Sequence, residues 1–592
     1  MKDLAISIGF PEHVIVGATG KAGGLCLFWS NAIDVQVLEF DSRTIAITVR
    51  DEFCLWSLIG FYGPPYQAKR RKAWCNLNAL LRSLNGPWMC FGDFNCVVSE
   101  SEKQGGVRGS PSTPTFLKDL LFDLEAVDLG YSGNQFTWWN KRWGKGAIRE
   151  RLDRAISNPS WRLAFPKAIV LHLGAINSDH APLLIDTNPD EDFCPRPFRF
   201  GAIWTKDPRC GSIISKAWSS KVQGTHSYIL CRKQALTTVA LKKWNKNVFG
   251  HCSTKIKELT DSIEEIQLHE RTETLARQEA YLQGELNEWL RRNETLWRQK
   301  SREMWLKEGD KNSKFFHLST VIRRKRNSID AIKDDAGVWI TSKRGIREHV
   351  VDKFTQLFTE ETVNFPLDLE NLISPTISPA DNLGLCRIPS AQEIKETIFD
   401  MQNQKSPGPN GLPALFYKKY WETVGNTVTE AVQSFFTSGR LLHEVNNTLI
   451  VLIPKTKSPS SVNNYRPISL CNTVCKTISK LLVSRIRPVL DKLISPSQSA
   501  FVPGRWIAEN QLIVHELLHS FKRRKVKGGF IALKIDLQKA YDRVNWNFLQ
   551  TVLTKFGFHG TFIKWVMECV STVSFSVLIN GGKSKPFNPR EV

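Results

Sequence analysis

The chain has 592 residues, 42% of them hydrophobic and 23% charged, a composition that is typical of globular proteins and excludes a disordered or fibrous chain. At about 150 residues per domain, this length predicts three or four domains. Lys and Arg number 80 against 58 Asp and Glu, which gives a net charge of +22 and favours a polyanionic partner, nucleic acid first.

The lack of targeting features and the number and spacing of the cysteines limit the cellular compartments in which the protein is expected. No apolar run is long enough to span a bilayer, and the first residues lack the basic region and apolar core of a signal peptide. We therefore expect a nuclear or cytoplasmic protein that is neither secreted nor bound to a membrane. The 13 cysteines are an odd number without a C-x2-C pair, which predicts reduced thiols and no zinc site. The sequence does not predict an oligomeric state.

In chain order, three textures predict three regions. Short β-rich runs separated by Gly, Pro, Asn and Ser fill residues 24–186 and predict a sheet-rich domain over 1–187. A proline-rich stretch then begins a linker, 188–389, whose residues 253–307 contain no proline and one glycine and are expected to form a long helical connector. Alternating helical and strand-like patches predict an α/β region over 390–592.

The connector ends in a basic segment. Residues 291–326 carry 12 Lys or Arg against 4 Asp or Glu, with tryptophans and phenylalanines between them, and they end in Arg323, Arg324, Lys325 and Arg326. Charge mixed with aromatic rings is typical of a binding site for a nucleic-acid strand. The alternative is an amphipathic helix whose charges face solvent and whose aromatic side chains face its own core.

Three short patterns in the first region carry chemistry. Gly92–Asn95 (GDFN) follows a strand-like run, Asp153 stands in RLDR, and Asp179 and His180 stand in SDH. Each pattern alone is ordinary, because Asp-x-Asn after a strand is usually a turn and an Asp–His pair is usually a surface pair. Their order resembles the endonuclease/exonuclease/phosphatase superfamily. That resemblance implies a pair of packed sheets flanked by helices, and cleavage of phosphodiesters with Mg2+.

The resemblance also implies a role for each residue. Asp93 would position or deprotonate the attacking water, and Asn95 would donate to the phosphate. His180 would stabilise the charged phosphoryl group, while Asp153 would orient the His180 ring. A carboxylate that holds an imidazole sets its tautomer and raises its basicity.

The metal site departs from the family pattern. By resemblance Asp179 would lie beside the Mg2+ and Tyr62 would contact the phosphate. Family members place a strand with an asparagine, and a metal-binding glutamate in an E-T-K box, before the Gly-Gly-Leu strand that is Gly23–Trp29 here. The only acids before that strand are Asp3 and Glu12, and neither stands in such a box. We therefore expect the domain to lack its first strand and its metal-ligand glutamate, which weakens metal binding and cleavage.

A second constellation lies in the third region. Residues 532–536 are expected to form an apolar strand that ends in Asp536, and Tyr541 follows five residues later. Taken alone, such an aspartate ends a strand and caps a helix. Upstream stand four phrases, KSPGPNG at 405–411, LIPK at 452–455, NYRPISL at 464–470 and QSAFVPGR at 498–505. Together they resemble, in order and spacing, the reverse transcriptases of plant non-LTR (LINE-type) retrotransposons, whose polyproteins put the endonuclease first.

Nucleotidyl transfer needs two metal ions held by aspartates at neighbouring strand ends. By resemblance Asp536 is the first of these metal ligands, and Tyr541 is the gate that rejects a 2′-hydroxyl. Lys455 and Arg466 would hold the triphosphate charge, Arg by bidentate contact and Lys as a point charge. Family members continue with a Gln-Gly-Asp-Pro box and an Ala-Asp-Asp hairpin that this sequence does not contain, so we expect no polymerisation by this chain alone.

The sequence thus predicts an α+β chain with a truncated two-sheet endonuclease/exonuclease/phosphatase domain, a helical basic connector, and partial reverse transcriptase fingers and palm. Mg2+ is the expected cofactor, and DNA and RNA are the expected partners. Three functions stay open: a weak metal-dependent nuclease, an inactive nucleic-acid-binding remnant, and a decayed gene product without a selected role.

Overall fold

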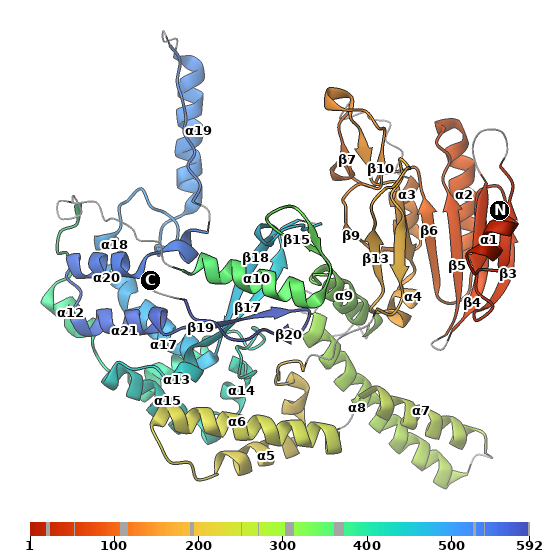
Figure 1. Ribbon diagram of the computed structural model, residues 1–592. Coiled ribbons are helices and arrows are strands. Elements are labelled where there is room, and N and C mark those ends of the chain that lie inside the picture. Colours follow the sequence, from red (N-terminus) through yellow and green to blue (C-terminus); the bar gives the residue numbers. More distant parts are fainter. Residues whose placement is uncertain are drawn as a thin grey trace. The chain divides into compact units, whose positions relative to one another are not determined.

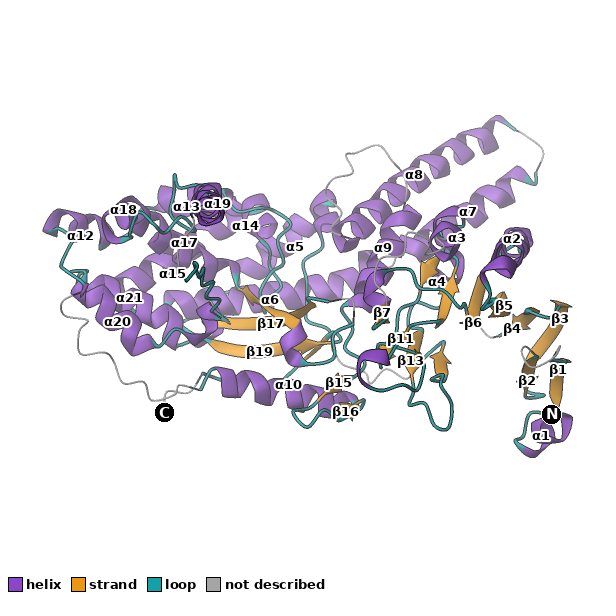
Figure 2. Cartoon of the chain, turned by 90° about the horizontal axis from the view of Figure 1, so that it is seen from above, coloured by secondary structure: helices purple, strands orange, loops and turns teal. Residues whose placement is uncertain are grey.

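The computed structural model describes residues 1–18, 24–51, 54–106, 116–189, 195–249, 252–269, 272–301, 313–359, 372–456, 458–524, 528–537 and 539–589. The chain divides into two compact units, each built from separate stretches. Unit 1 is Met1–Phe193, Lys300–Ile346 and Ile453–Arg466; unit 2 is Cys194–Gln299, Arg347–Leu452 and Pro467–Val592. Both units mix helices and strands (Figures 1 and 2), so the predicted α+β class is confirmed.

The main sheet of unit 1 has six strands among the described residues, in the order β3-β4-β5-β6-β12-β8. In β4, Ile45 and Ile47 belong to one buried cluster while Ala46 belongs to another. Because successive side chains of a strand point to opposite faces, the sheet separates two cores. The strands are β3 Asp34–Phe40, β4 Thr44–Arg50, β5 Leu55–Tyr62, β6 Trp88–Asp93, β8 Val127–Asp128 and β12 Asp153–Ser157.

Two helices cover one face of this sheet, and one helix and further strands cover the other. Trp74 and Leu77 of α2 (Gln67–Ser83) and Leu117 of α3 (Phe116–Asp123) are buried in the first core. The second core packs against α4, a β1-β2 hairpin and a β14-β13-β9 sheet. These elements are α4 Pro159–Ala164, β1 Glu12–Val16, β2 Leu25–Trp29, β9 Ser132–Gly133, β13 Ile169–His172 and β14 Leu183–Asp186. The expected endonuclease-like fold of packed sheets and flanking helices is confirmed.

Shorter elements complete unit 1. A β10-β11-β7 sheet lies beside the main sheet, and a β15-β16 hairpin follows α9. The Lys333 N–H of that hairpin donates to the Ser460 carbonyl at 2.7 Å, and the Ser458 hydroxyl donates to the Tyr131 oxygen at 2.5 Å. The segment Ile453–Arg466 is thereby bonded to unit 1. The elements are α1 Lys2–Ser7, η1 Glu100–Glu102, β7 Lys103–Gln104, β10 Trp138–Trp139, η2 Gly144–Gly146, β11 Arg149–Glu150, α9 Ser313–Arg326, β15 Ile332–Lys333, β16 Trp339–Ile340 and η5 Val462–Asn464.

Unit 2 is mainly helical around a sheet whose described strands run β18-β17-β19-β20 (Figure 2). The apolar run predicted around residue 450 forms β17, which pairs in parallel with β19. The strands are β17 Asn447–Pro454, β18 Tyr465–Cys471, β19 Ser574–Ile579 and β20 Gly582–Lys583. Helix α15 (Trp421–Ser438) is capped at its C-terminus by Gly439, whose φ of +64° is the left-handed conformation that glycine adopts most easily.

The helical connector predicted over 253–307 is confirmed in its described part, where α7 and α8 are two long helices (Figure 1). Residues 270–271 and 302–307 lie outside the described residues. Many of the described helices contribute side chains to one buried apolar cluster, whereas α10 and α19 contribute none. The helices of this part of the chain follow in chain order. They are η3 Ala202–Lys206, α5 Pro208–Trp218, α6 His226–Trp244, η4 Asn245–Phe249, α7 Cys252–Gln267, α8 Glu273–Ser301, α10 Lys343–Leu357, α12 Pro379–Leu385, α13 Ala391–Phe399, α14 Ala414–Lys419, α15 Trp421–Ser438, α16 His443–Asn446, α17 Thr473–Ile486, η6 Arg487–Val489, α18 Leu490–Leu493, α19 Ile507–Arg523, η7 Ala540–Arg543, α20 Trp546–Lys555 and α21 Gly560–Ser571. None of the helices in the described ranges is both long and apolar enough to cross a membrane.

The prediction of an apolar strand ending in Asp536 is wrong for this structure. Residues 531–537 form no strand, and the side chains of Ile531, Leu533 and Ile535 are 89%, 81% and 77% exposed. A strand needs a hydrogen-bonded neighbour, and β17 already has β18 on one side and β19 on the other. No strand of the described residues pairs with this run, so its apolar sequence alone does not produce one.

Candidate active site

Two of the predicted carboxylates meet at one end of the main sheet. Strand β6 ends at Asp93, the neighbouring antiparallel strand β12 begins at Asp153, and the register places these two residues directly opposite each other. Side chains of directly opposed residues lie about 5 Å apart at their Cβ atoms. The sheet register therefore brings together two acids that are 60 residues apart in the chain.

Asn95 completes a tight turn around Asp93. The Asn95 backbone N–H donates to Asp93 Oδ1 at 2.8 Å, and its Nδ2 donates to Asp93 Oδ2 at 2.7 Å and to the Gly63 carbonyl at 2.8 Å. A Cβ on Gly63 would lie 2.3 Å from the Phe94 carbonyl oxygen, so glycine is required at this close approach. Both Nδ2 hydrogens of Asn95 are engaged, and a phosphate would have to replace one of these acceptors.

His180 is bound to Asp153. Its Nδ1 lies 2.8 Å from Asp153 Oδ2, and since an ionised carboxylate only accepts, the ring donates at Nδ1 and turns Nε2 away from Asp153. The hydrogen bond to Asp153 raises the pKa of His180 against the opposing effect of burial, and the charges of Asp153, Asp93 and Asp179 raise it further. The imidazole therefore keeps its positive charge to a higher pH than an isolated histidine.

The pKa of Asp93 is higher than that of an exposed aspartate. Burial, and then the negative charge of Asp153, raise the pKa of Asp93 to about 6, against the hydrogen bonds from Asn95 and the charge of His180. A carboxylate with a pKa near the working pH is suited to accept a proton, because it is ionised and still basic.

Tyr62 reaches the same end of the sheet from β5. This strand runs parallel to β6, and the register pairs Tyr62 with Asp93. Burial and the charge of Asp93 raise the pKa of Tyr62, so its hydroxyl stays protonated. The Arg43 guanidinium lies 5.9 Å from the centre of the Tyr62 ring and donates to the Tyr62 carbonyl. The side chain is a neutral donor at the edge of the cluster.

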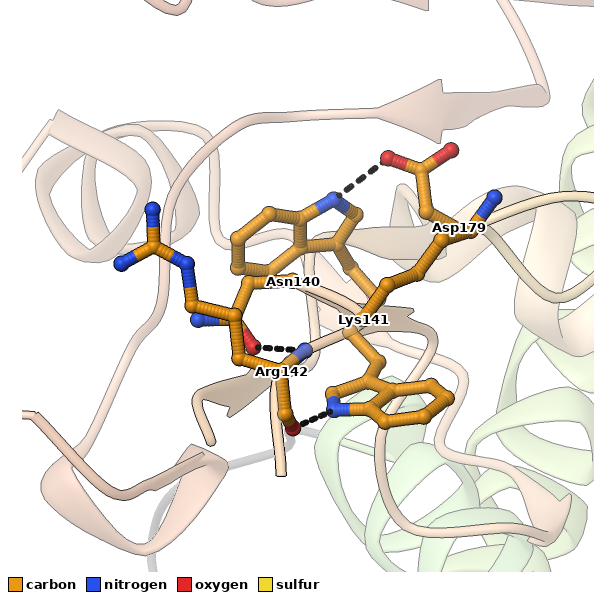
Figure 3. A pocket seen from close by; sticks show the side chains of 6 residues that line it. Asn140, Lys141, Arg142 and Asp179 are labelled. Atoms are coloured by element: carbon orange, nitrogen blue, oxygen red, sulfur yellow. Dashed lines mark hydrogen bonds between the residues drawn. The ribbon is translucent and has the colours of Figure 1, made fainter. Parts of the chain in front are cut away.

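Asp179 faces a different opening, shown in Figure 3. Its Oδ2 accepts the Trp138 indole N–H at 3.1 Å. Burial opposes ionisation, but hydrogen bonds from its own backbone and from Trp138, together with the charges of His180 and Lys141, outweigh it and leave the pKa of Asp179 below its usual value. The opening is an exposed pocket of about 490 Å³ lined by Trp138, Trp139, Asn140, Lys141, Arg142 and Asp179.

The cluster does not form a metal-binding set in the part of the chain that the structure describes. There, no group of three His, Cys, Asp or Glu side chains could hold a metal ion. Asp93 has both oxygens bonded to Asn95, and one Asp179 oxygen is bonded to Trp138. Mg2+ prefers several oxygen ligands in octahedral geometry, so these side chains do not fit it as they stand.

The predicted nucleotide-binding residues lie on two different units. Lys455 follows β17 in unit 1, where its Nζ donates to the Asn463 carbonyl at 2.9 Å, and Arg466 lies on β18. Asp536 lies on the exposed segment of unit 2 described above. Tyr541 lies in η7, is 75% exposed, and its ring meets that of Phe501 edge-on at 5.9 Å. Among the described residues, Asp536 belongs to no group of three His, Cys, Asp or Glu side chains that could hold a metal ion.

The basic cluster at the end of α9 is only partly exposed. Arg323 donates to the carbonyls of Lys300 and Ser301 at the end of α8, and Lys325 pairs with Asp330. Arg324 and Arg326 are exposed. Arg323 and Lys325 of the predicted nucleic-acid-binding cluster thus have partners within unit 1.

Comparison with known proteins assigns both ends of the chain. Residues 3–180 match the model of the endonuclease/exonuclease/phosphatase family, and residues 453–589 match that of reverse transcriptase (RNA-dependent DNA polymerase). The chain thus has an endonuclease/exonuclease/phosphatase-type domain near its start and a reverse transcriptase domain near its end. Its endonuclease domain precedes its reverse transcriptase domain, as the sequence predicted.

Similar proteins span both domains or one of them. The Transposon TX1 uncharacterized 149 kDa protein of Xenopus laevis is 24% identical over 605 residues, which cover 96% of this chain and 44% of that protein. The Pol polyprotein of the R2DM element of Drosophila melanogaster is 26% identical over 31% of this chain and 17% of its own length. Among solved structures, the endonuclease domain of TRAS1, a telomere-specific non-LTR retrotransposon, is 15% identical over 30% of this chain and 78% of that domain, with a TM-score of 0.25. The chain spans less than half the length of these two relatives.

Sequence reasoning missed the side chains that line the pocket in the endonuclease domain. Trp138, Trp139, Lys141 and Arg142 lie in the β10–β11 hairpin, next to Asp179. The phrase FTWWNKRW mixes basic and aromatic residues, which is the signal that singled out the connector. Applied to a short loop, the same criterion would have found them.

Proposed function

We propose that the endonuclease domain cleaves phosphodiester bonds of DNA at the cluster of Asp93, Asn95, Asp153 and His180. The observation that carries this proposal is the 2.8 Å contact of His180 Nδ1 with Asp153 Oδ2, beside an Asp93 that stands opposite Asp153 in the sheet. A held imidazolium and a nearby proton acceptor are the two groups that hydrolysis of a phosphodiester requires.

The chemistry follows from the positions of these side chains. A water oxygen attacks phosphorus while its proton passes to Asp93, and the bond from phosphorus to the leaving oxygen breaks. The leaving oxygen takes up a proton from solvent water and departs as the alcohol. His180, charged and held by Asp153, places Nε2–H against the phosphoryl oxygens as negative charge grows there. Tyr62 donates to the same phosphate, and Asn95 donates to it when Nδ2 exchanges one of its present acceptors.

The resemblance adds Mg2+ as cofactor, with Asp179 as a ligand. Because the described residues do not bring three ligands together, we expect weak affinity for Mg2+ and slow cleavage. Asp179 is also bonded to Trp138, so binding of a cation there would compete with that bond.

Plasmid nicking by the purified full chain tests the proposal. We expect nicking that grows with Mg2+ concentration without saturating early, and Asp93→Asn lowers the rate about 100-fold or more because the proton acceptor is lost. The matched control is Asp123→Asn, an exposed acid at the end of α3. Equal nicking by Asp93→Asn and wild type would contradict the proposal.

For the reverse transcriptase domain we propose that Lys455, Arg466 and Tyr541 contact the incoming nucleotide but that this chain alone does not extend a primer. The proposal is supported by the exposed, strandless setting of Asp536 and by the absence, within the described residues, of carboxylates grouped with it. Primer extension on an RNA template with Mg2+ or Mn2+ is the test, and any extension that Asp536→Ala removes would overturn it.

The partners proposed are therefore DNA and RNA, and the compartment is the nucleus or cytoplasm. The spelling of the reverse transcriptase phrases resembles plant LINE-type elements, and we propose a plant source. The test is a search of plant genomic DNA for the reading frame, and finding it only in animal genomes would contradict this origin.

A second candidate function is nucleic-acid binding without cleavage. It is favoured by the net charge of +22 and by exposed Arg324 and Arg326 on α9. Binding that neutralises phosphates weakens steeply with salt. Salt-dependent DNA binding by a chain that does not nick plasmid would favour this function over the first.

A further inference from the structure

Thr137, a residue of neither predicted constellation, joins three segments around the endonuclease site. It lies just before β10 and is buried, with 2% of its surface exposed. Its side-chain oxygen accepts the backbone N–H groups of Leu152 at 3.0 Å and of Asp153 at 2.9 Å. One hydroxyl therefore holds the chain at the point where β12 begins.

The backbone of Thr137 makes two further bonds. Its N–H donates to the Glu150 carbonyl at 3.0 Å, and its carbonyl accepts the Ala181 N–H at 2.7 Å. The next residue, Trp138, forms a bridge with His180, and the Trp139 N–H donates to the Asp179 carbonyl at 3.0 Å. This segment is thus bonded to both neighbours of His180.

The hydrogen bonds of the Thr137 side chain and those of the 137–139 backbone lead to the two residues of one contact, Asp153 and His180. The Asp153 backbone N–H donates to the Thr137 side-chain oxygen. The neighbours of His180 in the chain are hydrogen-bonded to the backbone of residues 137–139. The contact between them, His180 Nδ1 to Asp153 Oδ2, measures 2.8 Å. A reacting group that shifts by about 1 Å loses about 100-fold in rate, so a residue that fixes both partners has a direct effect on the reaction.

We propose that Thr137 is a positioning residue of this site, which holds the Asp153 carboxylate at the distance and angle that His180 needs. The inference rests on the proposed nuclease function for its kinetic part only. A valine at 137 keeps the size of the side chain but turns a methyl group toward two buried N–H groups, and unpaired buried donors force a local shift of the chain.

The kinetic test uses the full chain with three variants. Thr137→Val is expected to lower kcat for plasmid nicking about 10- to 100-fold, the usual loss when a group that orients a functional side chain is removed. KM for the DNA stays within about twofold of wild type, and Thr137→Ser, which keeps the hydroxyl, restores kcat. The matched control is Ser157→Ala. The Ser157 hydroxyl is buried in β12, the strand that begins at Asp153, and has no hydrogen-bond partner among the described residues.

A second readout does not depend on activity. In the full chain labelled with 15N-histidine, the proton on His180 Nδ1 should resonate far downfield in wild type, Thr137→Ser and Ser157→Ala, and should move upfield or vanish in Thr137→Val. If wild type does not nick but the resonance follows this pattern, the nuclease proposal fails and the positioning role stands. If Thr137→Val keeps both the resonance and the kcat of Ser157→Ala, the positioning role is wrong.

Where Thr137→Val does not fold, Thr137→Ala replaces it. The smaller side chain leaves room for a water that accepts the two backbone N–H groups, so this variant should fold. Its kcat should be lower than that of wild type and Thr137→Ser but still measurable. A Thr137→Ala chain with wild-type kcat and an unchanged His180 resonance would overturn the proposal.

Discussion

The end of the β6–β12 pair and the segment around Asp536 were singled out by the same kind of sequence signal, an apolar run that ends in an aspartate. In the endonuclease domain the run forms a strand, and Asp93 stands opposite Asp153. In the reverse transcriptase domain the run at 531–537 stays without strand structure, and most of its apolar side chains are exposed.

The difference lies in the neighbours. Strand β6 has β5 on one side and β12 on the other, so its register and therefore the position of Asp93 are fixed by two sets of hydrogen bonds. The run before Asp536 has no strand neighbour among the described residues. A motif identifies a carboxylate, but only paired strands place it where chemistry can use it.

Amide hydrogen exchange should show the largest contrast between the two regions. Amides of β5, β6 and β12 open only with the domain and should exchange about 1000-fold or more slowly than unprotected amides. Amides of residues 531–537 should exchange at nearly the unprotected rate. Protection of 531–537 equal to that of β6 would mean that the run is a paired strand in solution.

Ion pairs to Asp128 stabilise the start of β12, and substitution of Asp128 should remove them. Arg151 and Arg154, almost completely buried, bind Asp128 at 2.9 and 3.0 Å and share Glu102 as a second acid. Asp128→Asn leaves buried positive charge uncompensated and should lower the free energy of unfolding of unit 1 by about 3–5 kcal/mol. Urea unfolding measures this loss, and Glu39→Gln on exposed β3 is the control.

The same acids predict a dependence of stability on pH. Burial opposes ionisation of Asp128 and Glu102, but the arginine charges outweigh it and hold both pKa values below normal. Lowered folded-state pKa values stabilise the fold above the unfolded-state value near 4, and this stabilisation is lost as pH falls below it. Asp128→Asn should flatten that acid-side loss. An equally steep loss in the variant would show that these acids are not its source.

The rate of nicking should fall on the acid side at a higher pH than stability does. Because the pKa of Asp93 is raised to about 6, the fraction that can accept a proton drops about tenfold for each pH unit below that value. Nicking rates measured from pH 5 to 8 in a buffer of constant ionic strength provide the check. A rate that is flat down to pH 5 would show that Asp93 does not accept the proton.

Charge reversal on α9 should have the smallest effect. Arg324→Glu with Arg326→Glu should weaken DNA binding a few-fold and reduce the salt slope by roughly 0.9 for each phosphate that is no longer neutralised. Arg323→Glu with Lys325→Glu should instead lower stability, since these side chains bind the Ser301 carbonyl and Asp330 within unit 1. Equally weakened binding from both pairs would indicate that the whole cluster faces nucleic acid.

Local sequence predicted those parts of the site that depend on one strand end. Asp93 and Asn95 follow a buried strand, and the structure places them together as that pattern implies. The role of Thr137 depends on bonds to residues 15 and 16 positions away, and the partner of Arg323 lies 22 positions away. Such long-range contacts leave no periodicity in the sequence. The same limit explains the wrong prediction at Asp536. The apolar run before it predicts a strand, but a strand forms only where a neighbouring strand pairs with it.

A double-mutant cycle on Asp153 and His180 tests whether these two side chains act as one unit in phosphodiester cleavage. Plasmid nicking is measured for wild type, Asp153→Ala, His180→Ala and the double variant of the full chain. Each single change should slow nicking about 100-fold or more, and the double variant should be no slower than the slower single one. Losses that multiply in the double variant would show that the two side chains act independently, and single variants that nick like wild type would show that neither takes part in cleavage.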